Sequence, residues 1–210
     1  MTRVRRGTFL AVEGIDGVGK STLLRGLASA LRRRGFSVAV RREPSDPRLG
    51  ALAQSAGAED PWTGAVYFTV DRHLAAPELE RDLRTNDVVL QDRSFYSTLA
   101  YQGSALPPRD RRRLAELQRS ATRAPDRVVL LDLPTAEAFR RLGSRHTLRG
   151  PLERMKTLGR VARAYRSLAR SHGWLVVDAA VPPRELLRQV LERLDPILPR
   201  RPTQPRRRRR

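Results

Sequence analysis

A glycine-rich segment near the start of the chain constrains the fold more than any other feature. Residues 14–21 follow the pattern Gly-x-x-x-x-Gly-Lys-Ser. Its glycines allow successive backbone N–H groups to curl around an oxyanion, which a residue with a Cβ would obstruct. An apolar run over residues 8–12 precedes the segment, and leucines at helical spacing over residues 23–31 follow it. This order of strand, loop and helix predicts a phosphate-binding loop for a nucleoside triphosphate.

The chemistry of the predicted loop assigns roles to its charged and polar residues. Lys20 is expected to reach the β- and γ-phosphates, and the hydroxyl of Ser21 is expected to ligate Mg²⁺. Lys20 is one of two lysines in a chain that otherwise uses arginine for its positive charge. The residues expected to contact ATP are Gly14, Ile15, Asp16, Gly17, Val18, Gly19, Lys20, Ser21 and Thr22.

The composition narrows the class of protein. A chain of 210 residues can form one α/β domain with a sizeable core. It contains no cysteine, which excludes disulfides, zinc–thiolate sites and a cysteine nucleophile. No apolar run is long enough to span a membrane, and the first residues lack the design of a signal peptide. A soluble cytoplasmic protein is therefore expected.

The net charge of +20 raises the question of a nucleic-acid partner. Residues 200–210 contain seven arginines and no acid, and subtracting these seven leaves +13 on the rest of the chain. We expect residues 1–195 to form one domain and residues 196–210 to form a disordered Arg-rich tail. Such a tail can bind nucleic acid weakly and in a salt-dependent way, but we favour a solvated tail without a partner.

Strand-like and helix-like runs alternate along the chain, which is typical of a parallel sheet with helical crossovers. The predicted strands are 8–12, 36–40, 87–92, 127–132 and 174–178. The helix after the loop is followed by predicted helices at roughly 48–56, 61–84, 95–103, 108–122, 135–143, 152–171 and 183–194. Ligands of such sheets bind at the carboxyl ends of the strands, where residues 13–21, Arg42, Asp92, Arg93 and Asp132 fall. We therefore expect one site at this edge of the sheet.

The ends of the strands help to decide which phosphate reaction the loop serves. A GTPase needs Asn-Lys-x-Asp to read guanine, and this motif is absent from the chain. A hydrolytic ATPase usually ends a strand with Asp-Glu, whereas the candidate strands end in Asp92-Arg93 and Asp132-Leu133. An Asp followed by Arg favours a kinase, because Asp92 can hold Mg²⁺ while Arg93 bridges the donor and acceptor phosphates. The alternative for Arg93 is an ion pair with Asp92 or another neighbour.

Five motifs occur in an order and spacing that resemble those of thymidylate (dTMP) kinases. They are residues 13–22, Arg42-Glu43-Pro44, Phe68-Thr69-Val70-Asp71-Arg72, Asp92-Arg93-Ser94 and Leu99-Ala100-Tyr101-Gln102-Gly103, and the resemblance runs from about residue 8 to residue 194. It implies the P-loop fold of nucleoside-monophosphate kinases, in which helices flank a five-stranded parallel sheet in three layers and a short LID covers ATP. It also implies Mg-ATP and dTMP as substrates, ADP and dTDP as products, and usually a homodimer.

The resemblance also assigns residues to a dTMP site. It implies that Asp16 accepts a hydrogen bond from the sugar 3′-hydroxyl, and that Arg42 grips the phosphate with its guanidinium fork. Phe68 would stack on thymine, and Arg72, one helical turn further on, would donate to the base carbonyl O4. Tyr101 would crowd the 2′ carbon and so favour deoxyribose. The whole set is Asp16, Arg42, Phe68, Arg72, Arg93, Thr98, Tyr101 and Gln102, of which Thr98 and Gln102 are the weaker candidates.

The implied LID covers about residues 144–155. Some members of the family carry a catalytic arginine in the P-loop itself, but that position is Gly17 here. The chain therefore resembles the type in which a LID arginine supplies charge to the transition state. Arg149 is the first choice for this role, followed by Arg145 and Arg154. The catalytic residues expected are Lys20, Arg93, Asp16 and Arg149.

Ser94 departs from the motif, because many members have Tyr or His after the Asp-Arg pair. Asp-Arg-Ser is also similar to the Glu-Arg-Ser of deoxynucleoside kinases, whose acceptor is uncharged. Arg42 argues against that reading, because a nucleoside has no phosphate to grip. The alternatives are a deoxynucleoside kinase or another (d)NMP kinase and, from a different class, a basic nucleic-acid-binding protein that uses ATP only as a ligand.

Overall fold

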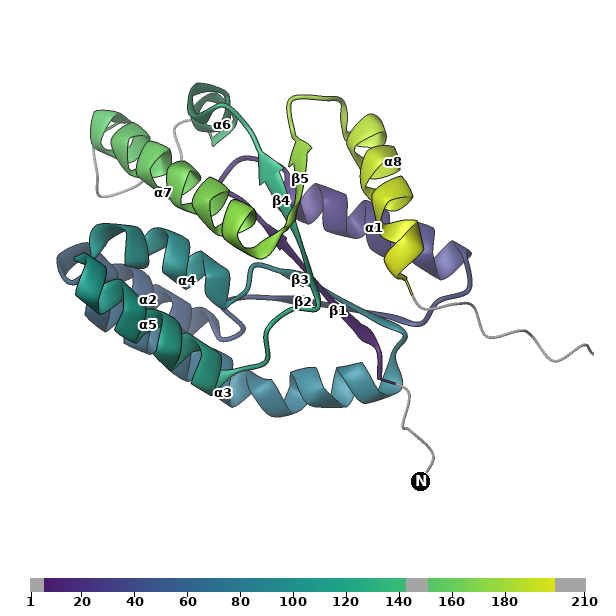
Figure 1. The fold of residues 1–210 in the computed structure, drawn as a ribbon, viewed down its shortest axis with the longest axis horizontal. Helices are drawn as coiled ribbons and strands as arrows, with labels where there is room; N and C mark the ends of the chain where they lie inside the picture. Colours follow the sequence, from purple (N-terminus) through teal and green to yellow (C-terminus); the bar gives the residue numbers. More distant parts are fainter. Residues whose placement is uncertain (1–5, 143–150, 199–210) are drawn as a thin grey trace, which may run out of the picture.

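A five-stranded sheet organises the computed structural model, which describes residues 6–142 and 151–198 (Figure 1). Neighbouring strands are parallel throughout. The strands are β1 (Thr8–Glu13), β2 (Val38–Arg42), β3 (Val88–Asp92), β4 (Arg127–Asp132) and β5 (Leu175–Asp178), in the spatial order β2-β3-β1-β4-β5. The predicted α/β fold with five parallel strands is confirmed.

Several helices begin with a proline in the first turn, and some of these also have an acidic cap. Asp46 and Asp60 precede two of them, and their side chains accept hydrogen bonds from the backbone N–H groups of Arg48 (2.7 Å) and Thr63 (2.8 Å). Two short 3-10 turns, Gly103–Ala105 and Asp195–Ile197, follow helices. The α-helices of the described residues are α1 (Lys20–Arg33), α2 (Pro47–Glu59), α3 (Pro61–Thr85), α4 (Phe95–Tyr101), α5 (Pro108–Ala121), α6 (Thr135–Leu142), α7 (Pro151–His172) and α8 (Pro183–Leu194).

Helices cover both faces of the sheet, which gives the expected three layers (Figure 1). α1 contacts β1, β2 and β3, while α8 contacts β5 and α1. On the other face, α3 contacts β3 and α7 contacts β4, with α4 and α5 packed against this layer. Val88, Val89 and Leu90 of β3 consequently have no exposed surface. Their apolar run is the pattern expected of a parallel strand that is buried on both faces.

The second strand is displaced from its predicted position at residues 36–40. The chain has a φ of 88° at Gly35, and the N–H of Phe36 donates to the carbonyl of Leu31, which closes the end of α1. Ser37 is bonded to the carboxylate of Asp87 through both its N–H (2.9 Å) and its hydroxyl (2.8 Å). These two residues are thus used to end the helix and to anchor the loop, so β2 begins only at Val38.

The described chain ends in a folded segment. Leu198 is partly buried against the main core, after the turn at Asp195–Ile197. The domain therefore continues past its predicted end at residue 195, and residues 199–210 of the predicted tail lie outside the described residues. So do residues 143–150 of the predicted LID, whereas residues 151–155 begin α7. Within the described ranges, none of the helices combines the length and apolar character needed to cross a membrane.

The register of the sheet brings the ends of its strands together. Asp92 pairs with Val12 on one side and with Arg42 on the other, and Asp132 pairs with Asp178. The loop that follows β1 therefore starts beside the end of β3. This confirms that the charged residues ending the strands lie along one edge of the sheet.

Candidate active site

The loop between β1 and α1 needs glycine at two positions where it approaches other elements. Gly14 and Gly17 have φ values of +142° and +86°, which residues with a Cβ rarely adopt. A Cβ at Gly14 would lie 2.7 Å from the carbonyl oxygen of Leu131, and one at Gly17 would lie 2.5 Å from that of Ala138. The loop leads directly into α1, whose N-terminus favours bound anions.

Lys20 is buried at the start of α1 and bends back over the loop. Its Nζ donates to the carbonyl oxygens of Gly14 (3.1 Å) and Ile15 (3.0 Å). Burial, helped by the positive charge of Arg93, lowers the pKa of Lys20 to about 8. A phosphate placed near Nζ would favour the charged form, so the charge of Lys20 responds to an occupant of the loop.

Ser21 and Asp92 meet where the P-loop faces the end of β3. The hydroxyl of Ser21 donates to Oδ2 of Asp92 over 2.8 Å. The second carboxylate oxygen, Oδ1 of Asp92, is buried and has no hydrogen-bond partner among the described residues. Mg²⁺ prefers oxygen ligands and is commonly held by one or two carboxylates together with substrate phosphates. The two side chains therefore fit a magnesium ion that is shared with a nucleotide.

A cavity of about 630 Å³, here called the acceptor cavity, opens beside the P-loop. The predicted dTMP residues that line it are Asp16, Phe68, Arg72, Arg93, Thr98, Tyr101 and Gln102. They come from the P-loop, α3, the end of β3 and the region of α4. The structure thus brings together side chains that are widely separated in the sequence.

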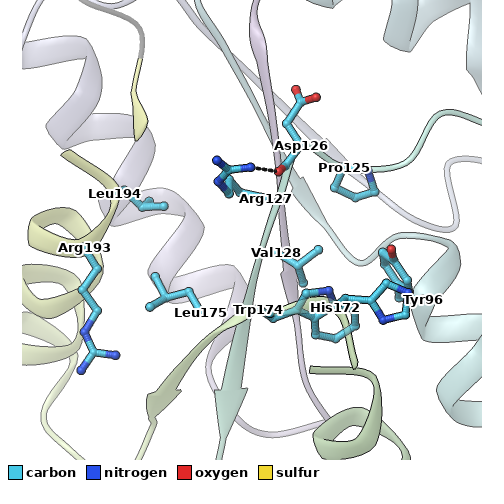
Figure 2. Close-up of a pocket in the computed structure, with 11 residues that line it drawn as sticks. Tyr96, Pro125, Asp126, Arg127, Val128, His172, Trp174, Leu175, Arg193 and Leu194 are labelled. Atoms are coloured by element: carbon cyan, nitrogen blue, oxygen red, sulfur yellow. Dashed lines mark hydrogen bonds between the residues drawn. The ribbon is translucent and has the colours of Figure 1, made fainter. Parts of the chain in front are cut away.

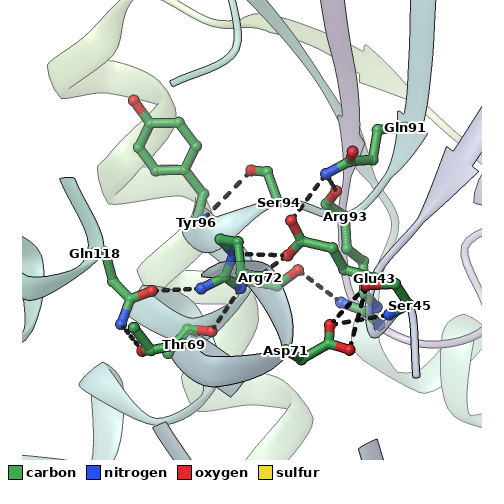
Figure 3. Close-up of polar contacts among 12 residues, drawn as sticks. Glu43, Ser45, Thr69, Asp71, Arg72, Gln91, Arg93, Ser94, Tyr96 and Gln118 are labelled. Atoms are coloured by element: carbon green, nitrogen blue, oxygen red, sulfur yellow. Dashed lines mark hydrogen bonds and ion pairs between the residues drawn. The ribbon is translucent and has the colours of Figure 1, made fainter. Parts of the chain in front are cut away.

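Arg72 is held in one orientation at the wall of the acceptor cavity (Figure 3). Its Nε and Nη2 donate to Oε2 of Glu43 over 3.0 Å and 2.7 Å, and Nη2 also donates to the hydroxyl of Thr98. Nη1 donates to the side-chain oxygen of Gln118. These contacts use four of the five guanidinium N–H groups, and leave one hydrogen of Nη1 for a ligand.

Arg93 stands between the P-loop and the acceptor cavity. Its backbone has a φ of 70°, which is uncommon for a residue other than glycine and is typical of functional sites. The guanidinium forms an ion pair with Asp16. The sequence leaves open an ion pair of Arg93 with Asp92 or another neighbour, and the partner in the structure is Asp16. It also lies 5.0 Å from the centre of the Tyr101 ring.

The charge of Asp16 is stabilised by its neighbours. Its side chain is half-exposed, and the hydroxyl of Tyr101 donates to it over 3.1 Å. Partial loss of water raises the pKa of the carboxyl, but the charges of Arg93 and Lys20 outweigh this effect and hold the pKa of Asp16 below its ordinary value. Asp16 is therefore a charged acceptor that faces both the P-loop and the acceptor cavity.

Several predicted residues lie elsewhere or outside the described side chains. Arg42 is exposed at the end of β2 and is not part of the lining of the acceptor cavity, although its neighbours Glu43 and Pro44 are. Asp132 is paired with Arg166 of α7 over 2.8 Å instead of lining the cavity. The three LID candidates, Arg145, Arg149 and Arg154, have side chains outside those that the structure describes.

Sequence reasoning assigned no individual role to several residues of the site. Arg160 and Thr157 of α7 line the acceptor cavity, and Nε of Arg160 donates to the hydroxyl of Ser104 over 3.3 Å. Glu13 is buried directly before the P-loop. It is the one charged residue in the apolar strand β1, and this signal could have drawn attention to it.

A second cavity, of about 420 Å³, lies at the opposite end of the sheet, where β4 and β5 begin (Figure 2). Tyr96, His172 and Trp174 form one side of it, and Arg127 and Arg193 also line it. None of the predicted site residues belongs to this lining. The acceptor cavity is therefore the candidate active site.

A P-loop whose Asp16 lines the acceptor cavity, with Arg93 standing between the two, can hold a phosphate donor and an acceptor side by side, which defines a P-loop kinase. A family model described as thymidylate kinase matches residues 12–190. The chain belongs to the thymidylate kinase family. The resemblance of the five motifs to those of thymidylate kinases is therefore confirmed. The alternatives of a deoxynucleoside kinase and of a basic nucleic-acid-binding protein are not favoured.

Named relatives agree with the family model over most of the chain. A probable thymidylate kinase of Pyrobaculum calidifontis is 36% identical over 189 residues, which cover 87% of this chain and 93% of the relative. A thymidylate kinase of Leifsonia xyli subsp. xyli is 38% identical over 202 residues, covering 91% and 96%. A probable thymidylate kinase of Sulfurisphaera tokodaii is 32% identical over 184 residues, covering 88% and 94%.

Proposed function

We propose that the protein transfers the γ-phosphoryl group of ATP to dTMP, giving ADP and dTDP, with dTMP bound in the acceptor cavity. One observation carries this proposal beyond family membership. Seven of the predicted dTMP residues line the acceptor cavity, and this cavity lies next to the P-loop. Asp16 belongs both to the P-loop and to the cavity lining. We also propose a cytoplasmic location for this reaction.

The donor half of the proposed site consists of the P-loop and the start of α1. Residues 14–22 surround the phosphates of ATP. The ammonium group of Lys20, which donates to the carbonyl oxygens of Gly14 and Ile15 in the structure, instead donates to the phosphates when ATP is bound. Ser21 and Asp92 would hold Mg²⁺, which would neutralise phosphate charge. The protein contributes position and fixed charge rather than covalent chemistry.

The acceptor half orients dTMP by its sugar, base and phosphate. Asp16 accepts from the 3′-hydroxyl, Phe68 stacks on the base, and the remaining N–H of Arg72 donates to O4. Tyr101 stands beside the 2′ carbon, with Thr98 and Gln102 as further contacts. Arg93 contacts the phosphate from the centre of the site, while Arg42 approaches it from the end of β2. Arg149 remains our choice for a cation supplied by the LID.

A coupled ADP-release assay over a panel of nucleosides and nucleoside monophosphates tests this function. We expect dTMP to be the best acceptor, because Arg72 reads O4 and Arg93 and Arg42 require a phosphate. Activity on thymidine without activity on dTMP would contradict the proposal. A weak contact between the Arg-rich tail and nucleic acid stays a separate prediction, since residues 199–210 lie outside the described part of the chain.

Replacing Arg72 with alanine should reduce the preference for thymine more than it reduces turnover. Cytosine presents an amino group where thymine presents O4. We expect the ratio of kcat/KM for dTMP to that for dCMP to fall about tenfold or more, which corresponds to ~1.4 kcal/mol or more, with a smaller loss in kcat for dTMP.

A matched control for this prediction is Arg41→Ala. Arg41 is also ion-paired, with Asp82 over 2.7 Å, but it is not part of the acceptor cavity. Its removal should leave the dTMP-to-dCMP ratio unchanged. An unchanged ratio in Arg72→Ala, in a protein with a normal unfolding transition, would show that Arg72 does not read the base.

An apolar stripe on α3 supports a homodimer. Val66, Val70 and Leu74 are 41%, 42% and 64% exposed, and their spacing of four residues places them on one face of the helix. Adjacent exposed apolar side chains commonly mark a protein–protein interface. We propose that a second copy of the chain covers this stripe.

Leu74→Asp should convert this dimer into monomers, because the interface would have to bury an unpaired carboxylate. Analytical ultracentrifugation of wild type and variant at equal concentration measures the effect. Val176→Asp places the same charge on an exposed apolar position of β5 and should remain dimeric. A monomeric wild type, or a dimer that survives Leu74→Asp, would exclude this interface.

A further inference from the structure

Glu13 is a fully buried carboxylate that the proposed reaction does not use. It ends β1 immediately before the P-loop, has no exposed surface, and is not part of the lining of the acceptor cavity. Placing a carboxylate in such an environment is costly unless it is well hydrogen-bonded. Burial indeed raises the pKa of Glu13, while the bond from Ser94 and the charge of Arg93 act in the opposite direction.

Four donors converge on this carboxylate from two other elements. Its Oε1 accepts from both the backbone N–H and the hydroxyl of Ser94, each over 2.7 Å. Its Oε2 accepts from the hydroxyls of Ser97 (2.7 Å) and Tyr165 (2.9 Å). Ser94 caps the N-terminus of α4, Ser97 lies in the first turn of this helix, and Tyr165 belongs to α7. Glu13 therefore joins β1 to α4 and to α7.

Two of these four groups also hold the side chain of Arg93. Its Nη1 donates to the hydroxyls of Ser97 (3.0 Å) and Tyr165 (3.2 Å), the two groups that donate to Glu13. Ser94, the residue bonded twice to Glu13, follows Arg93 directly in the chain. Because Arg93 has a left-handed backbone, with φ of 70°, a fixed next residue helps to maintain the direction in which its side chain leaves β3.

We propose that Glu13 is a positioning residue that acts through Arg93: it fixes both the backbone after Arg93 and the hydroxyls that orient the guanidinium toward the P-loop and the acceptor. Glu13 contacts no substrate. This inference rests on the proposed kinase function, since its effect is measured in phosphoryl transfer. A role confined to folding would instead lower stability without any dependence on Arg93.

Glu13→Gln tests this inference with little change in shape. The amide replaces one accepting oxygen with an NH₂ group that faces donors, so at least one pair of hydrogen bonds is lost. A displacement of a catalytic group by about 1 Å can cost about 100-fold in rate. We expect kcat with dTMP to fall by about 10- to 100-fold, while KM for ATP changes by less than about threefold, because the P-loop contacts remain.

A double-mutant cycle decides whether the effect passes through Arg93. In an Arg93→Ala background, Glu13→Gln should cause almost no further loss of kcat. Asp71→Asn is the matched control. Asp71 is also a buried carboxylate, but it accepts from the N–H groups of Ser45 (2.9 Å) and Asp46 (2.7 Å) (Figure 3). Its effect should be the same factor in both backgrounds.

The possible outcomes separate this inference from the proposed function. If wild type does not phosphorylate dTMP, the proposed function fails. If wild type is active and Glu13→Gln keeps its kcat, or loses the same factor with and without Arg93, the inference about Glu13 is overturned. Tyr165→Phe serves if Glu13→Gln does not fold, because it removes one hydroxyl shared by Glu13 and Arg93. Its loss of kcat should likewise vanish without Arg93.

Discussion

We expect Arg93→Ala to lower kcat by about 1,000-fold or more and to leave the fold intact. An arginine that neutralises the transferring phosphoryl group typically contributes a factor of this size. In the structure, the Arg93 guanidinium reaches Asp16 on the acceptor side and lies 3.5 Å from the carbonyl oxygen of Gly14 on the donor side. Its position between the two halves of the site makes it the side chain whose loss should slow transfer most. Steady-state kinetics at saturating ATP and dTMP measure the effect.

Two controls accompany the Arg93 experiment. Arg93→Lys keeps the positive charge but loses the guanidinium fork, and should fall between alanine and wild type. Arg188→Ala removes an exposed arginine that is paired with Glu185 and Glu192 on α8, and should keep the wild-type kcat. Thermal unfolding checks that each variant is folded. A folded Arg93→Ala enzyme within threefold of the wild-type kcat would remove Arg93 from the catalytic set.

Lys20→Ala should lower kcat by about 100- to 1,000-fold, the usual cost of removing one preorganised donor to developing charge. The chain provides its own control, because its other lysine, Lys156, is exposed on α7. Lys156→Ala should keep the wild-type kcat. If Lys20→Ala behaves in the same way, the phosphate-binding role of the loop lysine is wrong.

The pH dependence of ATP binding offers a second measurement on Lys20. Burial lowers the pKa of Lys20 to about 8 in the free enzyme, so the side chain loses its charge as the pH rises through this value. Bound phosphate favours the charged form, which means that ATP binding is coupled to proton uptake near this pH. We expect the Kd of the wild type for ATP to increase above about pH 8. In Lys20→Ala, this increase of the Kd should be absent.

Residues that follow a local pattern could be predicted from the sequence. The P-loop was identifiable because its glycines and lysine have fixed spacing between a strand and a helix. The four later strands were located because they are short apolar runs, and only the second was displaced by as much as two residues at both ends. Asp16, Phe68 and Tyr101 came from the resemblance of motifs, and the structure places all three on the acceptor cavity.

Long-range side-chain pairing could not be predicted, because it leaves no periodic or local signal. Gln118 lies on α5, yet its side chain holds Arg72 of α3. Glu43 stands next to the predicted phosphate ligand Arg42, yet it is the residue that lines the cavity and anchors Arg72. The direction of a side chain at the end of a strand depends on the neighbouring helices, and these are placed only by the complete fold.

The close approach of α6 to the P-loop restricts how this enzyme can change. A side chain at Gly17 would begin 2.5 Å from the carbonyl oxygen of Ala138. An arginine at this position would place its Cβ against the backbone of α6 and would have to adopt a φ of +86°. The backbone around Ala138 therefore has to shift before a side chain can be accommodated at residue 17. A P-loop arginine of the kind that some members of the family carry therefore calls for a second, compensating change near α6 in this chain.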